Sequence, residues 1–151
     1  MRIEIDISGQ VQQKNYDSAL GFWRDNGIEK AVHLSSKTKK EILRKYKGQV
    51  TNLIEKIHCI LIYYCIKEHM DNVNEIKICQ DINPRRLKNL LPLLFKENNF
   101  LANIKVELRY GKEPESKAHK IALKTFRKRK FASLLITKGM IENVLFEFKR
   151  K

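Results

Sequence analysis

The chain has few cysteines, and their spacing excludes the common zinc and disulfide frameworks. Cys59, Cys65 and Cys79 lie inside apolar runs, without CxxC spacing and without a histidine pair after them. An odd number of cysteines in such surroundings is typical of reduced core thiols in a cytosolic protein. We therefore predict a cytoplasmic location.

The chain also lacks a long apolar run and any segment of biased composition. Its longest apolar run, residues 57–66, is too short to cross a bilayer and is interrupted by His58. No apolar segment follows a basic start at the amino terminus, so the sequence gives no sign of secretion, and we expect no membrane partner. Because no internal repeat or low-complexity linker occurs, the 151 residues predict a single domain over 1–151.

Acidic residues are scarce relative to basic ones. The chain holds 17 Asp and Glu against 31 Lys and Arg, a formal net charge of +14, and its sequence pI is about 9.8. This much like charge opposes a compact state, and it favours a polyanionic partner. Nucleic acid is the first candidate, ahead of an anionic membrane surface, and an acidic protein partner is a further alternative.

The amino-terminal segment RIEIDISG has the alternation of a β-strand. Ile3, Ile5 and Ile7 alternate with polar residues, so the two faces of this strand meet different surroundings. Asp6 is unusual in such a run, because Asp is a poor strand former and its carboxylate is costly to bury. Either the second face of the strand is solvated, or Asp6 is a metal ligand at the centre of a sheet.

The patterns that follow predict alternating strands and helices. Strands are expected at residues 2–9, 19–24, 28–34, 75–79 and 104–108, with Asn26-Gly27 as a hairpin turn. Helices are expected from about 39, from 50 or 51 to about 70, from Pro84, over 116–130 and after Thr137. This order predicts an α/β fold with a mixed five-stranded sheet. Three antiparallel strands are followed by helix-strand-helix-strand-helix, with helices on both faces.

Three carboxylates lie at notable places in this order. Asp6 is in the first strand (IEIDISG), Glu55 near the start of the long helix (TNLIEKI), and Asp81 at the end of the fourth strand (ICQDINPRRL). The order and these positions resemble the ribonuclease H-like superfamily. The resemblance implies that the carboxylates hold two divalent metals, Mg²⁺ or Mn²⁺, for hydrolysis of a phosphodiester. The alternative is three unrelated residues: an exposed strand Asp, a helix Glu and a turn-forming Asp.

The region after the fifth strand departs from the superfamily pattern. Members usually bring a fourth acidic residue, or in some a histidine, from the last core helix or the loop before it. Here that region contains no Asp, and the candidates are Glu113, Glu115 and His119. His119 would take a metal position or shuttle protons near neutral pH. The alternative is a surface histidine on a lysine-rich helix.

Two groups of basic residues are predicted to contact nucleic acid. Arg85 and Arg86 lie in the first turn of a helix, where free backbone donors favour a phosphate, although a solvated helix end explains them equally well. The helical region from about residue 116 is so rich in positive charge that we expect it to contact the phosphate backbone. Its predicted contacts are Lys117, Lys120, Lys124, Arg127, Lys128, Arg129 and Lys130.

These observations favour a metal-dependent nuclease acting on structured or hybrid nucleic acid, such as an RNA–DNA hybrid, a duplex or a junction. Asp6, Glu55, Asp81 and His119 are its predicted catalytic residues. The first alternative is a catalytically weak or inactive ribonuclease H-like protein that binds nucleic acid through its basic helix, and the second is a protein-interaction module. The nuclease hypothesis predicts that the first and fourth strands are parallel neighbours and that the three carboxylates converge.

Overall fold

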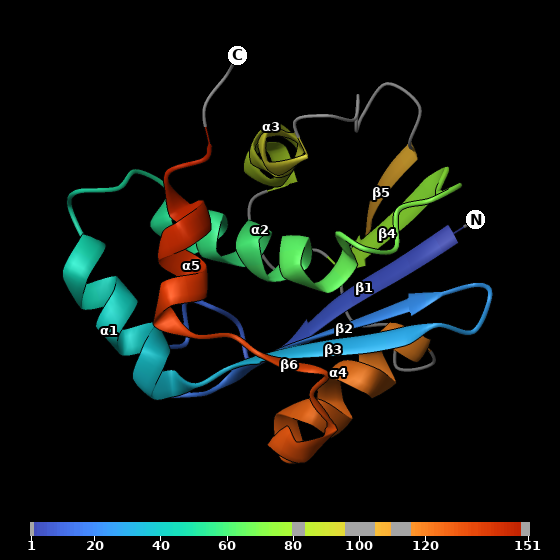
Figure 1. Ribbon diagram of the computed structural model, residues 1–151, viewed down its shortest axis with the longest axis horizontal. Helices are drawn as coiled ribbons and strands as arrows, with labels where there is room; N and C mark the ends of the chain where they lie inside the picture. Colours follow the sequence, from blue (N-terminus) through green and yellow to red (C-terminus); the bar gives the residue numbers. More distant parts are fainter. Residues whose placement is uncertain (1, 80–83, 96–104, 110–115, 149–151) are drawn as a thin grey trace.

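In the computed structural model, which describes residues 2–79, 84–95, 105–109 and 116–148, one mixed sheet has helices on both faces (Figure 1). The elements in chain order are β1 (Arg2–Ser8), β2 (Ser18–Arg24), β3 (Glu29–Leu34), α1 (Ser36–Tyr46), α2 (Leu53–Ile66), β4 (Glu75–Cys79), α3 (Pro84–Leu94), β5 (Lys105–Arg109), α4 (Lys117–Arg127), the 3₁₀ turn η1 (Arg129–Phe131), β6 (Leu134–Leu135) and α5 (Lys138–Leu145). The α/β class predicted from the sequence is therefore confirmed.

The strand order of the sheet is β5-β4-β1-β2-β3-β6. β1, β2 and β3 form an antiparallel meander, whereas β4 lies parallel to β1 and β5 parallel to β4. The expected parallel pairing of the first and fourth strands is thus confirmed. All five expected strands are present, and β6 extends the sheet beside β3, because the amides of Ser133 and Ile136 donate to the carbonyls of Ala31 and His33.

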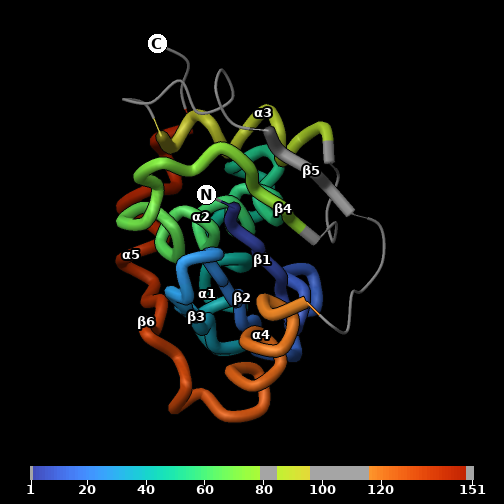
Figure 2. Tube along the Cα trace, turned by 90° about the vertical axis from the view of Figure 1, so that its right-hand side faces the viewer, coloured from blue at the N-terminus to red at the C-terminus, as the bar shows by residue number. Residues whose placement is uncertain are grey.

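The helices form two layers on opposite faces of the sheet. Helix α2 crosses one face and packs against β2 and β3, with α3 and α5 packed on its outer side. Helix α4 lies on the other face, against β1, β2 and β3, and continues into η1. Figures 1 and 2 show α4 separated from α2 by the sheet. β1 therefore has one helical layer on each side.

Helix α2 is the centre of the larger layer. Its sequence LIEKIHCILIYYCI is apolar around most of its circumference, as expected of a helix enclosed on all sides. Ile57, Ile60 and Ile66 are fully buried. The helix is shorter than the predicted 50–70, because Asn52 adopts a left-handed conformation (φ 53°) directly before it and helical hydrogen bonding ends near Ile66.

The connection between β1 and β2 is held by a buried lysine. Lys39 of α1 is fully buried, and its Nζ donates to the backbone carbonyls of Gln10, Gln13 and Tyr16 at 3.1, 3.1 and 2.7 Å. These bonds replace part of the hydration of the ammonium group, while burial lowers the pKa of Lys39 to about 8. The connection is thereby fixed against α1.

Candidate active site

β1 directs Asp6 toward the layer that contains α4. Ile3, Ile5 and Ile7 are buried among the core residues, and strand alternation puts Glu4 and Asp6 on the opposite face. The Asp6 side chain is only 6% exposed. Its burial contradicts a simply solvated second face, so the carboxylate needs partners within the protein.

A glycine lets α4 approach this face closely. Gly21 of β2 pairs with Asp6 across the antiparallel ladder. A Cβ atom at Gly21 would lie 2.6 Å from both the carbonyl oxygen of Ala118 and the amide nitrogen of Ala122. The backbone of α4 therefore rests directly on β2, and its first turn lies beside β1.

The start of α4 binds the two acidic side chains of β1. Ser116 caps the helix by accepting a hydrogen bond from the His119 amide at 3.3 Å, and its hydroxyl donates to Glu4 Oε1 at 3.1 Å. His119 Nδ1 lies 2.9 Å from Asp6 Oδ2, and Asp6 Oδ1 accepts from the amide of Ile7 at 2.8 Å. Asp6 and His119, two of the predicted catalytic residues, are thus in direct contact.

This contact gives the imidazole of His119 a defined orientation. An ionised carboxylate only accepts hydrogen bonds, so Nδ1 of a neutral His119 carries the proton and Nε2 carries the lone pair. None of the described residues hydrogen-bonds Nε2, and the side chain is 14% exposed. The pair can therefore accept or release a proton at Nε2 while Asp6 holds the ring.

Glu55, the second predicted carboxylate, has a different partner. It lies in the first turn of α2 with a side chain that is 15% exposed, and its Oε1 accepts from Arg86 Nη1 of α3 at 2.8 Å. Arg86 is half-exposed, so this ion pair contributes little to stability. Glu55 and Arg86, predicted to serve the metal and the nucleic acid respectively, are paired with each other.

Asp6 retains capacity for a metal ion. A carboxylate has about four lone-pair sites, and the two hydrogen bonds described above occupy two of them. Its oxygens suit Mg²⁺ or Mn²⁺, whereas the imidazole of His119 is a poorer ligand for Mg²⁺. No group of three His, Cys, Asp or Glu gathers among the described residues. Asp81, Glu113 and Glu115 lie outside the described residues.

The titratable groups behind Glu55 are unsuited to proton transfer or nucleophilic attack. Burial lowers the pKa of His58 to about 4, partly opposed by the negative charge of Glu55. Burial also raises the pKa of the Cys59 and Cys65 thiols far above the ordinary range, so both remain protonated at pH 7. These thiols and His58 are core groups of α2.

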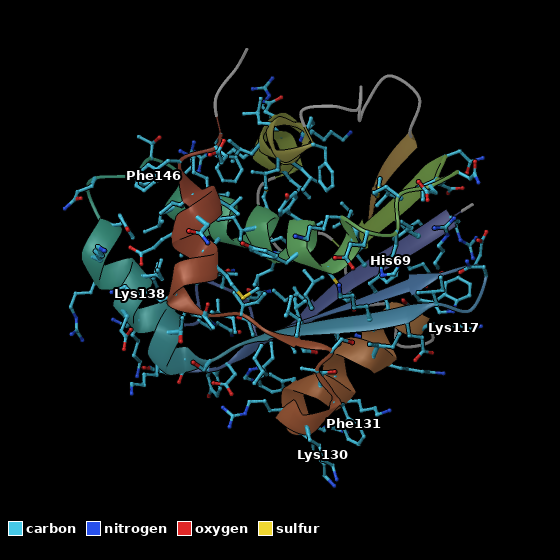
Figure 3. All side chains as sticks on the ribbon, in the orientation of Figure 1. His69, Lys117, Lys130, Phe131, Lys138 and Phe146 are labelled. Atoms are coloured by element: carbon cyan, nitrogen blue, oxygen red, sulfur yellow. The ribbon has the colours of Figure 1, made fainter. Side chains whose placement is uncertain are left out.

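The predicted nucleic-acid contacts of the basic region are all exposed. Helix α4 ends at Arg127 and the chain continues as η1, so the single helix predicted over 116–130 is divided in two. Figure 3 shows Lys130 and Phe131 projecting from this end of the molecule. Lys124 Nζ lies 4.2 Å from the centroid of the Phe131 ring, which is 42% exposed. The exposed cations are Lys117, Lys120, Lys124, Arg127, Lys128, Arg129 and Lys130, and Arg85 is exposed on α3.

Sequence patterns alone missed the residues that bring Asp6 and His119 together. Ser116 had only the signal of a helix cap, and its bond to Glu4 depends on the tertiary fold. Gly21 carried a usable signal, because a glycine within a strand often marks a close backbone approach. Reading Gly21 this way predicts a helix against β2, without saying which helix.

Comparison with known proteins assigns no family. No family model matches the chain, and no curated protein or solved structure matches it. Within the described ranges, no helix is long and apolar enough to span a membrane. Function must therefore be inferred from the geometry of the site and from the distribution of charge.

Proposed function

We propose that this chain is a Mg²⁺- or Mn²⁺-dependent nuclease of ribonuclease H-like type, with its reaction centred on Asp6. The observation that carries this proposal is the contact between buried Asp6 on a central strand and His119 on the helix after β5. The strand order supports it, because an antiparallel meander followed by parallel β4 and β5 is the arrangement that the resemblance implies. The net charge of +14 supports a polyanionic substrate.

The proposal gives each residue a separate role. Asp6 holds the metal, with Asp81, which follows β4 in the sequence, as a further carboxylate. Glu55 lies on α2, in the layer across the sheet from α4, and is paired with Arg86, so the predicted convergence of Glu55 with Asp6 is not part of this proposal. When bound, the ions supply Lewis-acid chemistry and activate water for attack on phosphorus. His119 moves a proton through Nε2, since Nδ1 is engaged by Asp6. Arg86, held by Glu55 at 2.8 Å, lies where it can meet a phosphate beside that carboxylate.

A second candidate function is nucleic-acid binding without cleavage. It is favoured by the engagement of Glu55 with Arg86, which provides the carboxylate with a counter-ion other than a metal. The exposed cations of α4 and η1 suit contacts to a phosphate backbone whether or not cleavage follows. A nuclease loses cleavage when Asp6 is replaced, whereas a protein that only binds nucleic acid has no cleavage to lose and keeps its binding.

Cleavage assays with Asp6→Asn distinguish these candidates. Hybrid, duplex, junction and single-stranded substrates are incubated with purified protein in Mg²⁺, Mn²⁺ or EDTA. We expect metal-dependent cleavage by the wild type and none by Asp6→Asn, because Asn keeps the shape of the side chain but lacks the charge that holds the ion. Equal cleavage by both proteins would indicate a contaminating nuclease. No cleavage of any substrate, with binding retained, would favour the second candidate.

A further inference from the structure

A large pocket lies outside the contact between Asp6 and His119. It has a volume of about 960 Å³, near the upper end of the range for ligand pockets. Its walls are α1, the first turn of α2, the segment between them, and the β1–β2 connection that Lys39 holds in place. Because the connection is anchored at three carbonyls, this wall is preformed.

The rim of the pocket is strongly basic. Lys14 comes from the β1–β2 connection, Lys40 and Arg44 lie one turn apart on α1, and Lys47 directly follows the end of this helix. All four are exposed, and none forms an ion pair with a described residue. At a rise of 1.5 Å per residue, Lys40, Arg44 and the adjoining Lys47 form a row about 10 Å long. Such a row can follow successive phosphates of one strand.

The floor of the pocket is apolar. It consists of Leu43, Val50, Leu53 and Ile54, which are partly or fully buried. Gln12 and Asn15 add amide groups beside this floor, and amides are the side chains that pair with the edges of bases. Glu55, whose carboxylate is paired with Arg86, completes the lining.

We propose that this pocket binds an unpaired segment of nucleic acid, with its bases against the apolar floor and its phosphates on the basic row. Apolar contact for base faces together with cations for the backbone is the combination that single-strand binding requires. An acidic apolar peptide is the competing occupant. The regular row of unpaired cations, the amide groups and the net charge of +14 favour nucleic acid. The inference goes beyond the proposed active site and rests on the proposed function only in that both surfaces take nucleic acid.

The first test measures binding of a fluorescein-labelled single-stranded 12-mer, as RNA and as DNA, in EDTA so that cleavage cannot occur. The double variant Arg44→Gln/Lys47→Gln should bind roughly tenfold more weakly and lower the magnitude of the salt slope by about 1.4, since each single-strand phosphate contact contributes about 0.7. The matched control Lys67→Gln/Lys138→Gln carries the same charge change on α2 and α5 and should bind nearly as the wild type does. Equal losses in the two variants would show a general charge effect and overturn the proposal.

The second test locates the bound strand by cross-linking. An oligonucleotide carrying one 5-iodouracil is cross-linked to the wild-type protein by ultraviolet light, and the modified peptide is identified by mass spectrometry. We expect cross-links within residues 40–55, and their loss in Arg44→Gln/Lys47→Gln. Cross-links confined to other segments would contradict the proposal. So would preferential binding of a Glu- and Leu-rich peptide that the double variant abolishes, because the occupant would then be a protein.

These outcomes are separable from those of the nuclease assay. If the protein binds single strands through the pocket but never cleaves them, the pocket proposal is supported and the nuclease proposal is contradicted. If cleavage needs both a metal and Asp6, and the pocket variant binds single strands as the wild type does, the nuclease proposal is supported and the pocket proposal is contradicted.

Discussion

Asp6 and His119 determine each other's chemistry. The carboxylate of Asp6 lies within the sheet, and its side chain is only 6% exposed. Its hydrogen bonds to Ile7 and His119 offset the cost of removing the carboxylate from water. In return, the carboxylate of Asp6 determines that Nδ1 of a neutral His119 carries the proton and that Nε2 carries the lone pair. Removal of either residue leaves the other with an unsatisfied group, so conservative replacements are the informative ones.

His119→Gln should slow cleavage without abolishing it. Glutamine can still hydrogen-bond Asp6 but cannot move a proton, and general acid–base groups contribute roughly 10²–10⁴-fold to rates. The pH–rate profile of the variant should also lose the limb that reports the imidazole. The measurement is initial cleavage rate from pH 5 to 9, with His69→Gln on the other face of the sheet as control. A rate and profile equal to the wild type would exclude His119 from proton transfer.

The contact between these residues could be anticipated only in part. The alternation of Ile3, Ile5 and Ile7 predicts that Asp6 faces away from the apolar layer, and this is a local property of the strand. The partner could not be predicted the same way, because 113 residues separate Asp6 from His119. Glu55 lies near the start of its helix, as predicted, but its ion pair with Arg86 depends on how α3 packs against α2.

His58 makes stability depend on pH. Burial lowers its folded-state pKa to about 4, below the ordinary value of 6.5, and its Nδ1 has no hydrogen-bond partner among the described residues. The unfolded chain binds the proton first, so this contribution to stability is complete above pH 6.5 and is lost as the pH falls toward 4. The loss reaches about 3 kcal/mol, at 1.36 kcal/mol for each pKa unit.

His58→Leu removes this titration and should be as stable as the wild type or more so at pH 7. Chemical denaturation of both proteins at intervals from pH 7 to 4 gives the difference between their free energies of unfolding. The difference should grow in favour of the variant as the pH falls. Parallel curves over this range would contradict the assignment, because the carboxylates shared by both proteins cancel in the comparison.

At the scale of elements, the position of α4 depends on its close approach to β2. Helix α4 presents Ala118 and Ala122 to the sheet, both fully buried, and Gly21 opposite them has no side chain. Small residues on both sides let the backbones approach closely. This approach puts Ser116 and His119 within hydrogen-bonding distance of Glu4 and Asp6.

Gly21→Ala should destabilise the protein and impair the site together. The added Cβ meets backbone atoms of α4 at 2.6 Å, so the helix must move. Overpacking of this kind costs about 1–3 kcal/mol. The control is Gly139→Ala in α5, where the nearest atom to the new Cβ is 4.0 Å away. Thermal or chemical unfolding measures the loss, and equal stability of the two variants would show that α4 does not rest on Gly21.

Local sequence patterns predict where the helices and strands lie better than they predict which strands pair. The strand predicted at 75–79 has the observed bounds of β4, and Thr137 caps α5 as predicted, because alternation and capping are short-range properties. The pairing of β6 with β3 was not predicted. Two residues carry no periodicity, and the hydrogen bonds between Ser133 and Ala31 join positions 102 apart in the sequence.

Across the described part of the molecule, exposed positive charge gathers at two separate places. One is the surface of α4 and η1, and the other is the pocket rim on α1; Figure 1 shows these helices apart from each other. Charge on α4 surrounds an exposed aromatic ring, Phe131, whereas the rim of the pocket surrounds an apolar floor. A nucleic acid with paired and unpaired parts could contact both surfaces, the duplex on α4 and the single strand in the pocket.

The two surfaces should therefore respond to different nucleic acids. If the proposed function holds, replacing Lys124, Arg127 and Arg129 by Gln removes contacts to a duplex backbone, and such contacts carry no sequence information. We expect weaker duplex binding for all sequences alike, with the salt slope reduced by roughly one unit for each lost contact. Single-strand binding in the pocket should change much less. The measurement is fluorescence anisotropy at several salt concentrations with duplex and single-stranded probes of equal length.

The matched control is the triple variant Lys37→Gln/Lys67→Gln/Lys138→Gln, which changes the net charge equally and leaves α4 and η1 intact. If both triple variants lower the duplex salt slope by the same amount, binding responds to the overall field of the protein, and α4 has no special part in it. If only the α4 variant does so while Arg44→Gln/Lys47→Gln affects only single strands, the charge of this chain is divided between two binding surfaces. Asp6→Asn should leave duplex binding and single-strand binding intact, because Asp6 is buried beneath α4 and contributes no cation.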